Sequence, residues 1–233
     1  MPNPNTISSN KGRFLGTWNL DFDGWRGQLT VRRSTDTANG VTRLGHFLQD
    51  GGTTPMAVNG NTIDAGRGLR FSIENSNNPP LTQQNGTMQS VWHGTTSSEF
   101  ASGRNVWNDT PYGTLLSRSA IPTVPGTFTS DRWVGSWRVV EDGTTAGTLT
   151  ITSVGAPLNG RRNLTGSFRT TTGTTRSIKA TTNPDHVLDL TVNSLLGNRS
   201  YTLHAHTRET NVLSGWTQPA GSLEKREAHA LRA

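Results

Sequence analysis

One pattern occurs twice in the chain, as Phe14-Leu-Gly-Thr-Trp-Asn-Leu20 and as Trp133-Val-Gly-Ser-Trp-Arg-Val139. In the first copy, large apolar residues alternate with polar ones, which is typical of a β-strand with one dry face. The apolar face carries Phe14, Trp18, Leu20 and Phe22. The turn dipeptide Asp23-Gly24 follows, and alternation resumes over Gln28–Arg32, so this region predicts a β-hairpin.

The similarity between the two halves continues in the same order along the chain. Five further pairs of blocks match: Gly27–Val31 with Gly147–Ile151, Leu44–Phe47 with Thr165–Phe168, Leu69–Ile73 with Leu188–Val192, Ser102-Gly103 with Ser214-Gly215, and Tyr112–Leu115 with Ala220–Leu223. Such a repeat predicts two domains of one fold. We place them at residues 12–118 and 131–233, joined by the proline- and glycine-containing linker 119–130.

The spacing of short strands predicts an all-β fold. About eight strands separated by short turns fit into the second repeat, and helical periodicity is almost absent. Eight strands in a meander close into a barrel, so we predict two tandem eight-stranded antiparallel β-barrels. A pair of β-sandwiches is the alternative, because the same strand spacing allows it. The tail from Leu223 is predicted as a last strand ending in a helical turn.

Composition excludes several classes of protein. The 233 residues contain no cysteine, which excludes disulfides and thiolate chemistry, and no apolar run is long enough for a membrane span. The net charge of +6 is dispersed, unlike the clustered basic face of a nucleic-acid-binding protein. No phosphate loop, dinucleotide fingerprint or Gly-x-Ser-x-Gly motif occurs, so we expect no cofactor. The lysine-poor surface, rich in Thr, Asn and Gly, favours an extracellular location.

Together, the early Gly-x-Trp, the Gly-x-Leu-Thr-Val/Ile strand, the Gly-x-Phe strand and the eight-strand meander resemble the calycin superfamily, the avidin and lipocalin type of barrel. The resemblance covers residues 14–118 and 133–224. It implies a barrel that binds a small, mostly apolar ligand, and it implies that the tryptophan of Gly-x-Trp plugs one barrel end. Gly16, Trp18, Gly135 and Trp137 are then structural residues. The polar residues and later tryptophans that hold biotin in avidins have no counterparts here that can be placed.

Strand alternation also predicts which side chains face the two lumens. The first set is Phe14, Trp18, Leu20, Phe22, Leu29, Val31, Phe47, Leu69, Phe71 and Ile73. The second set is Trp133, Trp137, Val139, Leu149, Ile151, Phe168, Leu188, Leu190, Val192, Tyr201 and Leu203. Both lumens are therefore apolar, and they are either fully packed cores or cavities for an apolar ligand.

Ionisable residues give no clear catalytic or metal-binding pattern. His204 and His206 share one strand face, the spacing of a metal site, but no third ligand is evident, and their parity points them outward. We therefore predict no metal. The acids that offer general acid or base chemistry are expected on surfaces and turns: Asp21, Asp23, Glu141, Asp142 and Glu209.

The sequence favours binding over catalysis. Tryptophans beside Asn, Asp and Gln in loops are suited to closing a barrel mouth or stacking on a sugar. We expect ligand contacts from Trp92, His93, Trp107, Tyr112, Tyr201 and Trp216. The partner is then a small hydrophobic molecule or a glycan, and a homo-oligomer is also considered. Two alternatives stay open: a barrel enzyme, such as a cyclase, isomerase or lyase, that uses the lumen as a dry chamber, and a lectin or self-assembling surface protein.

Overall fold

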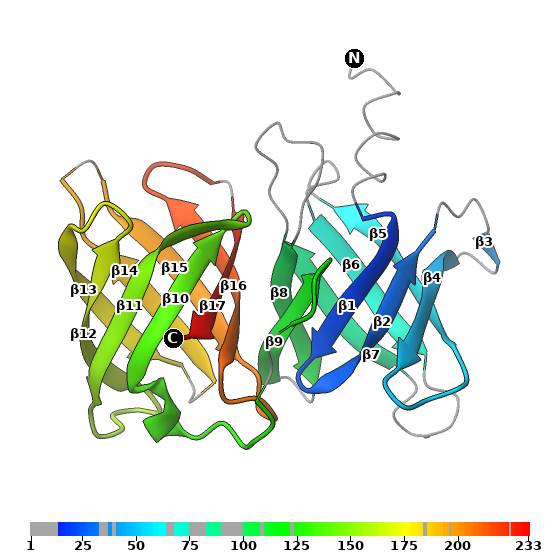
Figure 1. Cartoon of the computed structure of the whole chain (residues 1–233), viewed down its shortest axis with the longest axis horizontal. Coiled ribbons are helices and arrows are strands. Elements are labelled where there is room, and N and C mark those ends of the chain that lie inside the picture. Colours follow the sequence, from blue (N-terminus) through cyan, green and yellow to red (C-terminus); the bar gives the residue numbers. More distant parts are fainter. Residues whose placement is uncertain are drawn as a thin grey trace, which may run out of the picture.

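The computed structural model describes residues 14–32, 37–38, 41–63, 68–74, 83–89, 100–107, 110–121, 124–183, 186–195, 197–223 and 225–233. Within these ranges the chain is all-β, with one short 3₁₀ helix, η2 (Ser130–Trp133), ahead of the second group of strands (Figure 1). No helix in the described ranges is long and apolar enough to cross a membrane.

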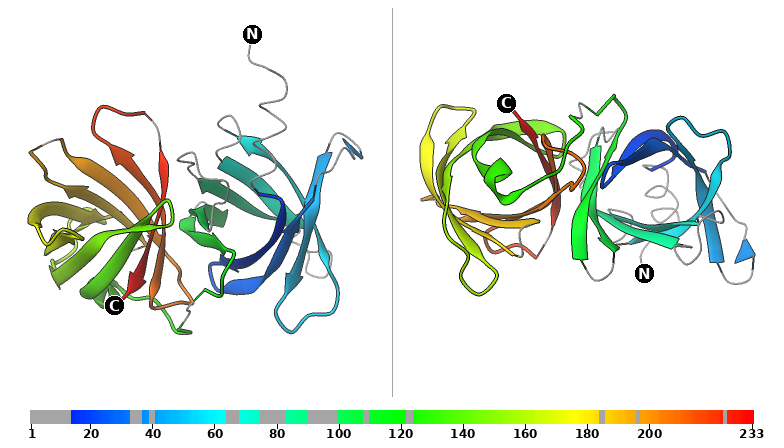
Figure 2. Two further views of the ribbon diagram at one scale, coloured as in Figure 1. Left: turned by 45° about the horizontal axis from the view of Figure 1, so that its top comes forward. Right: turned by 90° about the horizontal axis from the view of Figure 1, so that it is seen from below.

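The second half of the chain forms a closed eight-stranded barrel (Figure 2). Each strand pairs antiparallel with its neighbours in sequence, and the last strand pairs with the first. The predicted meander barrel is therefore confirmed, and the sandwich alternative is not adopted. The strands are β10 (Gly135–Glu141), β11 (Thr144–Val154), β12 (Arg162–Thr170), β13 (Thr175–Thr182), β14 (Val187–Val192), β15 (Arg199–Ala205), β16 (Val212–Pro219) and β17 (Arg226–Arg232).

The first half forms a curled sheet whose backbone pairings also return to their starting strand. β1 pairs with both β2 and β9, and the pairing of β2 with β4 completes the ring, while the two-residue β3 pairs only with β4. The strands are β1 (Gly16–Phe22), β2 (Trp25–Val31), β3 (Thr37–Ala38), β4 (Val41–Gln49), β5 (Met56–Ile63), β6 (Gly68–Glu74), β7 (Gln83–Gln89), β8 (Phe100–Trp107) and β9 (Thr110–Ser117).

The same cross-strand register recurs in both halves. Gly16 lies opposite Val31 and Gly135 lies opposite Ile151, and both glycines have positive φ angles, 101° and 134°. The first turn of each half is an Asp-Gly pair with both residues at positive φ, as a two-residue type I′ hairpin requires. The first two strands of each half therefore pair in the same register, at positions that match in the sequence repeat.

The last pair of matched blocks in the sequence does not occupy equivalent positions in the structure. Gly221 lies in the turn before β17, so the predicted match of Tyr112–Leu115 with Ala220–Leu223 is wrong. Pairing with the first strand of each half places Leu115 and His229 at equivalent positions. The tail continues as strand β17 and does not end in a helical turn.

One end of each ring of strands is closed in the same way. The Trp18 Nε1–H donates to the Phe14 carbonyl at 2.7 Å, and the Trp137 Nε1–H donates to the Trp133 carbonyl at 3.1 Å. An arginine from the last strand region covers each indole. The Arg118 guanidinium lies 3.6 Å from the ring centroid of Trp18, and that of Arg232 lies 4.4 Å from the ring centroid of Trp137.

The same arginines also satisfy the backbone that leads into each first strand. Arg118 donates to the Leu15 carbonyl at 2.8 Å, and Arg232 donates to the Val134 carbonyl at 3.1 Å. Each closed end is therefore an indole held between a backbone carbonyl and a guanidinium.

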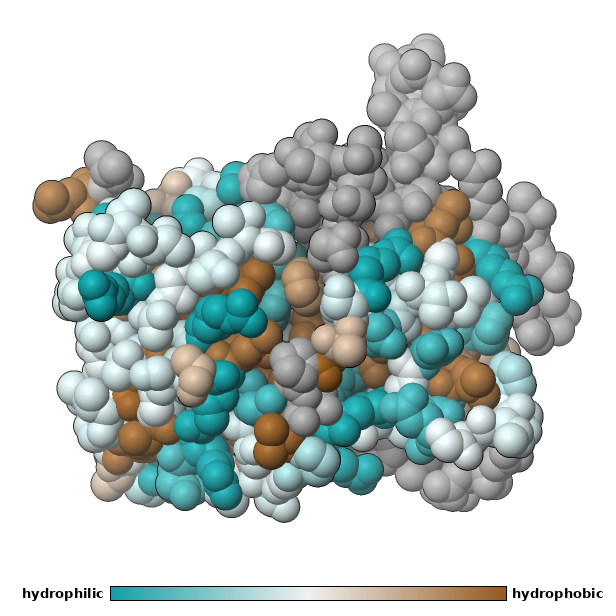
Figure 3. Space-filling model, viewed as in Figure 1, coloured by the Kyte–Doolittle hydropathy of each residue, from teal (hydrophilic) through white to brown (hydrophobic). Residues whose placement is uncertain are grey.

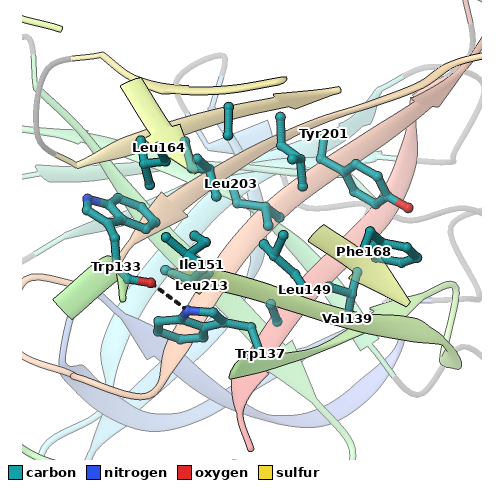
Figure 4. Close-up of a cluster of buried hydrophobic side chains, with 14 of the residues drawn as sticks. Trp133, Trp137, Val139, Leu149, Ile151, Leu164, Phe168, Tyr201, Leu203 and Leu213 are labelled. Atoms are coloured by element: carbon teal, nitrogen blue, oxygen red, sulfur yellow. Dashed lines mark hydrogen bonds between the residues drawn. The ribbon is translucent and has the colours of Figure 1, made fainter. Parts of the chain in front are cut away.

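Every residue predicted for the two lumens is buried. In the second barrel the lumen side chains form one cluster that runs from Trp133 and Trp137 towards Phe168 and Tyr201 (Figure 4). Burying this much apolar surface is the main source of stability for such a barrel.

The two halves lie side by side, with β8 and β9 against the outer face of β15, β16 and β17 (Figures 1 and 2). Ser102 on β8 is fully buried there, and its hydroxyl lies 2.6 Å from the Gly215 carbonyl oxygen on β16. An apolar cluster of Leu115, Val212 and Leu231 completes the contact. Polar and apolar side chains are therefore both buried between the halves, while the outer face drawn in Figure 3 mixes hydrophilic, intermediate and hydrophobic residues.

Candidate functional site

The open end of the β10–β17 barrel contains a cavity of about 350 Å³. It lies among inward-facing side chains at the strand ends and the loops that join β14 to β15 and β16 to β17. The opposite end is closed by Trp133 and Trp137, so the barrel is a cup with a packed floor (Figure 4). The lining residues are Glu141, Ala146, Phe168, Thr170, Arg176, Val192, Ser194, Gly197, Asn198, Arg199, Tyr201, Pro219 and Ala220.

Three polar side chains form a network on the wall of this cavity. The Tyr201 hydroxyl donates to Glu141 Oε1 at 2.5 Å, and Arg199 forms a salt bridge with Glu141 Oε2. Burial, together with the negative charge of Glu141, raises the pKa of Tyr201 far above its usual value, so the phenol stays protonated and acts as a donor. Although burial opposes it, the pairing with Glu141 raises the pKa of Arg199. Both carboxylate oxygens of Glu141 therefore have a partner, Tyr201 for Oε1 and Arg199 for Oε2.

Arg176 is the second cation of the cavity. Its Cα lies opposite that of Phe168 in the β12–β13 ladder, and Phe168 points into the lumen. Among the described residues, no carboxylate forms a salt bridge with Arg176, although the side chain is partly buried. The guanidinium is therefore available at the cavity wall for a ligand.

The equivalent positions of the first half carry a different chemistry. Phe22 is the last residue of β1, as Glu141 is of β10, and Met56 faces Phe47 across the ladder as Arg176 faces Phe168. Phe22 is buried, with its ring centroid 5.7 Å from that of Phe71. The register places Gln84 and Gly86 where the second half has Arg199 and Tyr201. The fold therefore does not require the charged groups of the second barrel.

A second polar cluster lies between the two halves and not in a lumen. The His206 Nδ1–H donates to Asp21 Oδ1 at 2.9 Å, and His206 Nε2 lies 2.7 Å from the hydroxyl oxygen of Ser214. Burial alone would raise the pKa of Asp21, but the charge and hydrogen bond of His206 and the Gly24 N–H outweigh it and lower that pKa.

This Asp-His-Ser arrangement has the connectivity of a nucleophile activated by a base. All three residues are fully buried, so no substrate reaches the serine in this structure. The expectation that Asp21 lies on an open surface is therefore wrong. It does face outward from its own strand ring, but the second barrel covers it, and the cluster joins the two halves.

Other residues expected at the surface are buried in the same contact. His204 is 1% exposed and Glu209 is fully buried, where it forms an ion pair with Arg26. Burial and nearby Arg104 lower the pKa of His204 to about 3, so this imidazole is neutral. His229 donates to Glu227 Oε1 at 2.6 Å. The predicted outward direction of His204 and His206 is correct, and both outward-facing side chains are buried.

Asp23 and Asp142 occupy equivalent turns, and the turn predicted at Asp23-Gly24 is confirmed. Asp23 also reaches the second barrel, because the Thr207 hydroxyl donates to its Oδ2 at 2.8 Å. Burial raises the pKa of Asp23, despite the hydrogen bonds from Thr207. In the described part of the chain, no three His, Asp or Glu side chains converge as a metal site requires.

The structure brings one of the predicted ligand residues, Tyr201, to the cavity. Trp216 lies on the outer barrel face. Its ring centroid is 5.2 Å from that of His204 and 4.3 Å from the Lys225 Nζ. Tyr112 contacts His186 with 5.5 Å between ring centroids. Trp107 is the last residue of β8, and its side chain is not among the described ones. Trp92 and His93 lie outside the described residues.

Sequence reasoning missed Glu141, Arg176 and Arg199 as cavity residues. A signal for two of them was present. Glu141 follows Trp137 and Val139 at alternate positions, and Arg199 precedes Tyr201 and Leu203 in the same way. A charged residue that continues a dry strand face is unusual and marks the open end of a lumen.

No protein-family model and no curated protein matches the chain. Among solved structures, the chain is similar to a protein of unknown function of the DUF3598 family from Nostoc punctiforme, with 9% identity and a TM-score of 0.28 over 97% of this chain and 98% of that chain. It is also similar to the Burkholderia oklahomensis agglutinin, with 11% identity and a TM-score of 0.22 over 94% of this chain and 86% of that chain. Both TM-scores are low, so neither likeness assigns this chain to a family or a function.

Proposed function

We propose that the protein binds a small amphipathic molecule in the open end of the β10–β17 barrel. The observation that carries the proposal is the cavity of about 350 Å³, which is lined by aromatic and charged side chains from β10, β12, β13 and β15. Ligand pockets are concave and mostly apolar, with a few placed polar groups, and this size is at the lower end of their range.

The difference between the two halves supports this proposal. Both have apolar lumens and a Trp–Arg closed end, but the described part of the first half has Phe22 and Met56 where the second has Glu141 and Arg176. Charged groups that the fold does not require cost desolvation energy, so a use for them outside folding is expected.

The closed ends also support the finer proposal that both halves are calycin-like barrels that arose by duplication. The resemblance implied that Trp18 and Trp137 plug one end of each barrel, and both indoles are fully buried beneath an arginine. The shared register of Gly16 and Gly135 supports an internal repeat with domains at 12–118 and 131–233.

Fluorescence titration with the neutral apolar dye N-phenyl-1-naphthylamine tests the proposed function. Ala220 is exposed on the rim of the cavity, so Ala220→Trp obstructs the entrance without disturbing the core. The control is Leu158→Trp, which adds the same side chain at an exposed turn between β11 and β12, at the other end of the barrel.

We expect saturable one-to-one binding to the wild type and to the control, and at least about tenfold weaker binding to Ala220→Trp. Equal binding to all three proteins would place the dye elsewhere and overturn the proposal. Ala146→Phe, which fills the cavity from its wall, is a second variant for the same comparison.

A further inference from the structure

We propose that the natural ligand of this cavity is a monoanion with a flat apolar body, and that Arg176 holds its anionic group. The inference rests on the proposed function and specifies the ligand class for the same site. It follows from the charges, the rings and the register of the cavity wall.

The charged groups that line the cavity do not balance one another. Three of the lining residues are charged: Glu141, Arg176 and Arg199. Glu141 and Arg199 neutralise one another through their salt bridge, and the Tyr201 hydroxyl occupies the remaining carboxylate oxygen. The wall therefore has one positive charge in excess, on Arg176. A ligand with one negative group neutralises it and leaves no unpaired charge in the cavity.

The apolar part of the cavity lining contains two aromatic rings. The rings of Phe168 and Tyr201 are stacked at an interplanar angle of 30°, with centroids 6.2 Å apart. The two rings come from β12 and β15 and line the cavity together with the apolar side chains of Ala146 and Val192, so this part of the lining is an aromatic surface. A planar apolar body lies against such a surface with more contact than a branched one.

The unpaired cation and the aromatic rings are close together in the lining. Arg176 and Phe168 are direct cross-strand partners, and side chains at such positions lie next to each other on one face of the sheet. The cation and the ring surface are therefore adjacent, so one ligand can use both if its anionic group is attached directly to the flat body.

The lining residues disfavour a second anionic group on the ligand. Glu141 stays in the wall as a carboxylate held by Arg199 and Tyr201. Arg199 is already paired with this carboxylate, so a second anionic group of the ligand would find no unpaired cation among the lining residues. The network therefore selects against dianions, while Arg176 selects for a single charge.

The matched probes are 2-naphthoate and 2-naphthamide, which share one flat body and differ in carboxylate against neutral amide. Their binding is measured by displacement of N-phenyl-1-naphthylamine and directly by calorimetry. The variants are Arg176→Gln, which removes the cation, and Arg176→Lys, which keeps the charge but loses the planar fork. The control is Arg169→Gln on β12, because Arg169 is exposed on the outer face beside Phe168.

We expect the wild type to prefer naphthoate over naphthamide by about tenfold or more. Arg176→Gln abolishes this preference and leaves the affinity for naphthamide unchanged. Arg176→Lys keeps part of the preference, and Arg169→Gln keeps all of it.

Equal affinities for the two probes in the wild type, with dye binding intact, would overturn the monoanion inference and leave the proposed function standing. A preference for naphthoate that survives Arg176→Gln would overturn the role of Arg176. Failure of the dye and both probes to bind would overturn the proposed function and this inference together.

Discussion

The carboxylate of Asp21 and the imidazole of His206 are 185 residues apart in the sequence and are joined by a buried hydrogen bond of 2.9 Å. Asp21 stands on the outer face of β1 and His206 follows β15, so the bond connects the two halves of the chain. Ser214 extends it into β16. A buried charge-assisted contact of this kind fixes the orientation of two packed units, because a displaced arrangement leaves its polar groups unpaired.

Replacing Asp21 with Asn tests this contact. The amide keeps the size of the side chain but loses the charge that pairs with His206, so we expect the free energy of unfolding to fall by roughly 2–4 kcal/mol. Urea unfolding followed by tryptophan fluorescence measures the change. Asp50→Asn, at an exposed position, is the matched control and should have almost no effect. Equal effects of the two substitutions would show that the buried contact adds no stability.

His204 predicts how stability depends on pH. Burial and Arg104 lower the pKa of His204 to about 3, whereas a histidine in an unfolded chain has a pKa of about 6.5. Between these values the unfolded state binds a proton that the folded state does not bind, so the contribution is complete above about pH 6.5 and is lost progressively as the pH falls towards 3. We expect a decline of up to roughly 1 kcal/mol per pH unit from this residue.

The measurement is urea unfolding of the wild type and His204→Gln between pH 4.5 and 7. The groups that face His204 are Arg104, His206 and Lys225, so their protonation is common to both proteins. A shallower dependence in the variant is the expected result. Parallel curves would assign the pH dependence to other groups.

Arg232 closes the second barrel and should stabilise it through several contacts at once. It covers Trp137 and donates to the carbonyls of Val134 and Thr210, at 3.1 and 3.2 Å. We expect Arg232→Ala to lower the free energy of unfolding by roughly 2–3 kcal/mol, with only partial rescue by Arg232→Lys, which lacks the planar fork. Thermal melting of both variants, with exposed Arg169→Ala as the control, makes the comparison. Full rescue by lysine would show that charge alone is needed.

Much of the fold could be predicted from the sequence because strand alternation is a local signal. The faces of Trp18, Leu20 and Phe22 follow from parity alone, and the repeat places the same register in both halves. The last block of the repeat could not be placed reliably. Gly113 and Gly221 both precede small or apolar residues, but one lies within a strand and the other in a turn.

The location of the buried ionisable groups could not be predicted in the same way. Parity correctly assigns Asp21 and His206 to outer faces, yet an outer face is either solvated or covered by another unit, and only the packing of the two halves decides between these. The cavity residues are an intermediate case. Glu141 continues an inward face, but the salt bridge with Arg199 joins residues 58 apart in sequence, which no local pattern reveals.

Neutralising Glu141 should strengthen the binding of a monoanion. In Glu141→Gln the wall keeps both arginines and loses its one negative charge, so the net charge of the lining groups rises from +1 to +2. We expect the affinity for 2-naphthoate to increase by about three- to tenfold at low salt, and we expect the increase to shrink as salt screens the charges. The affinity for 2-naphthamide should not change, because this neutral probe has no charge that could respond.

Displacement titrations at two salt concentrations measure both effects, with Asp189→Gln on the outer face of β14 as the control. Weaker naphthoate binding in Glu141→Gln would show instead that the carboxylate is needed to hold Arg199 and Tyr201 in place for the ligand.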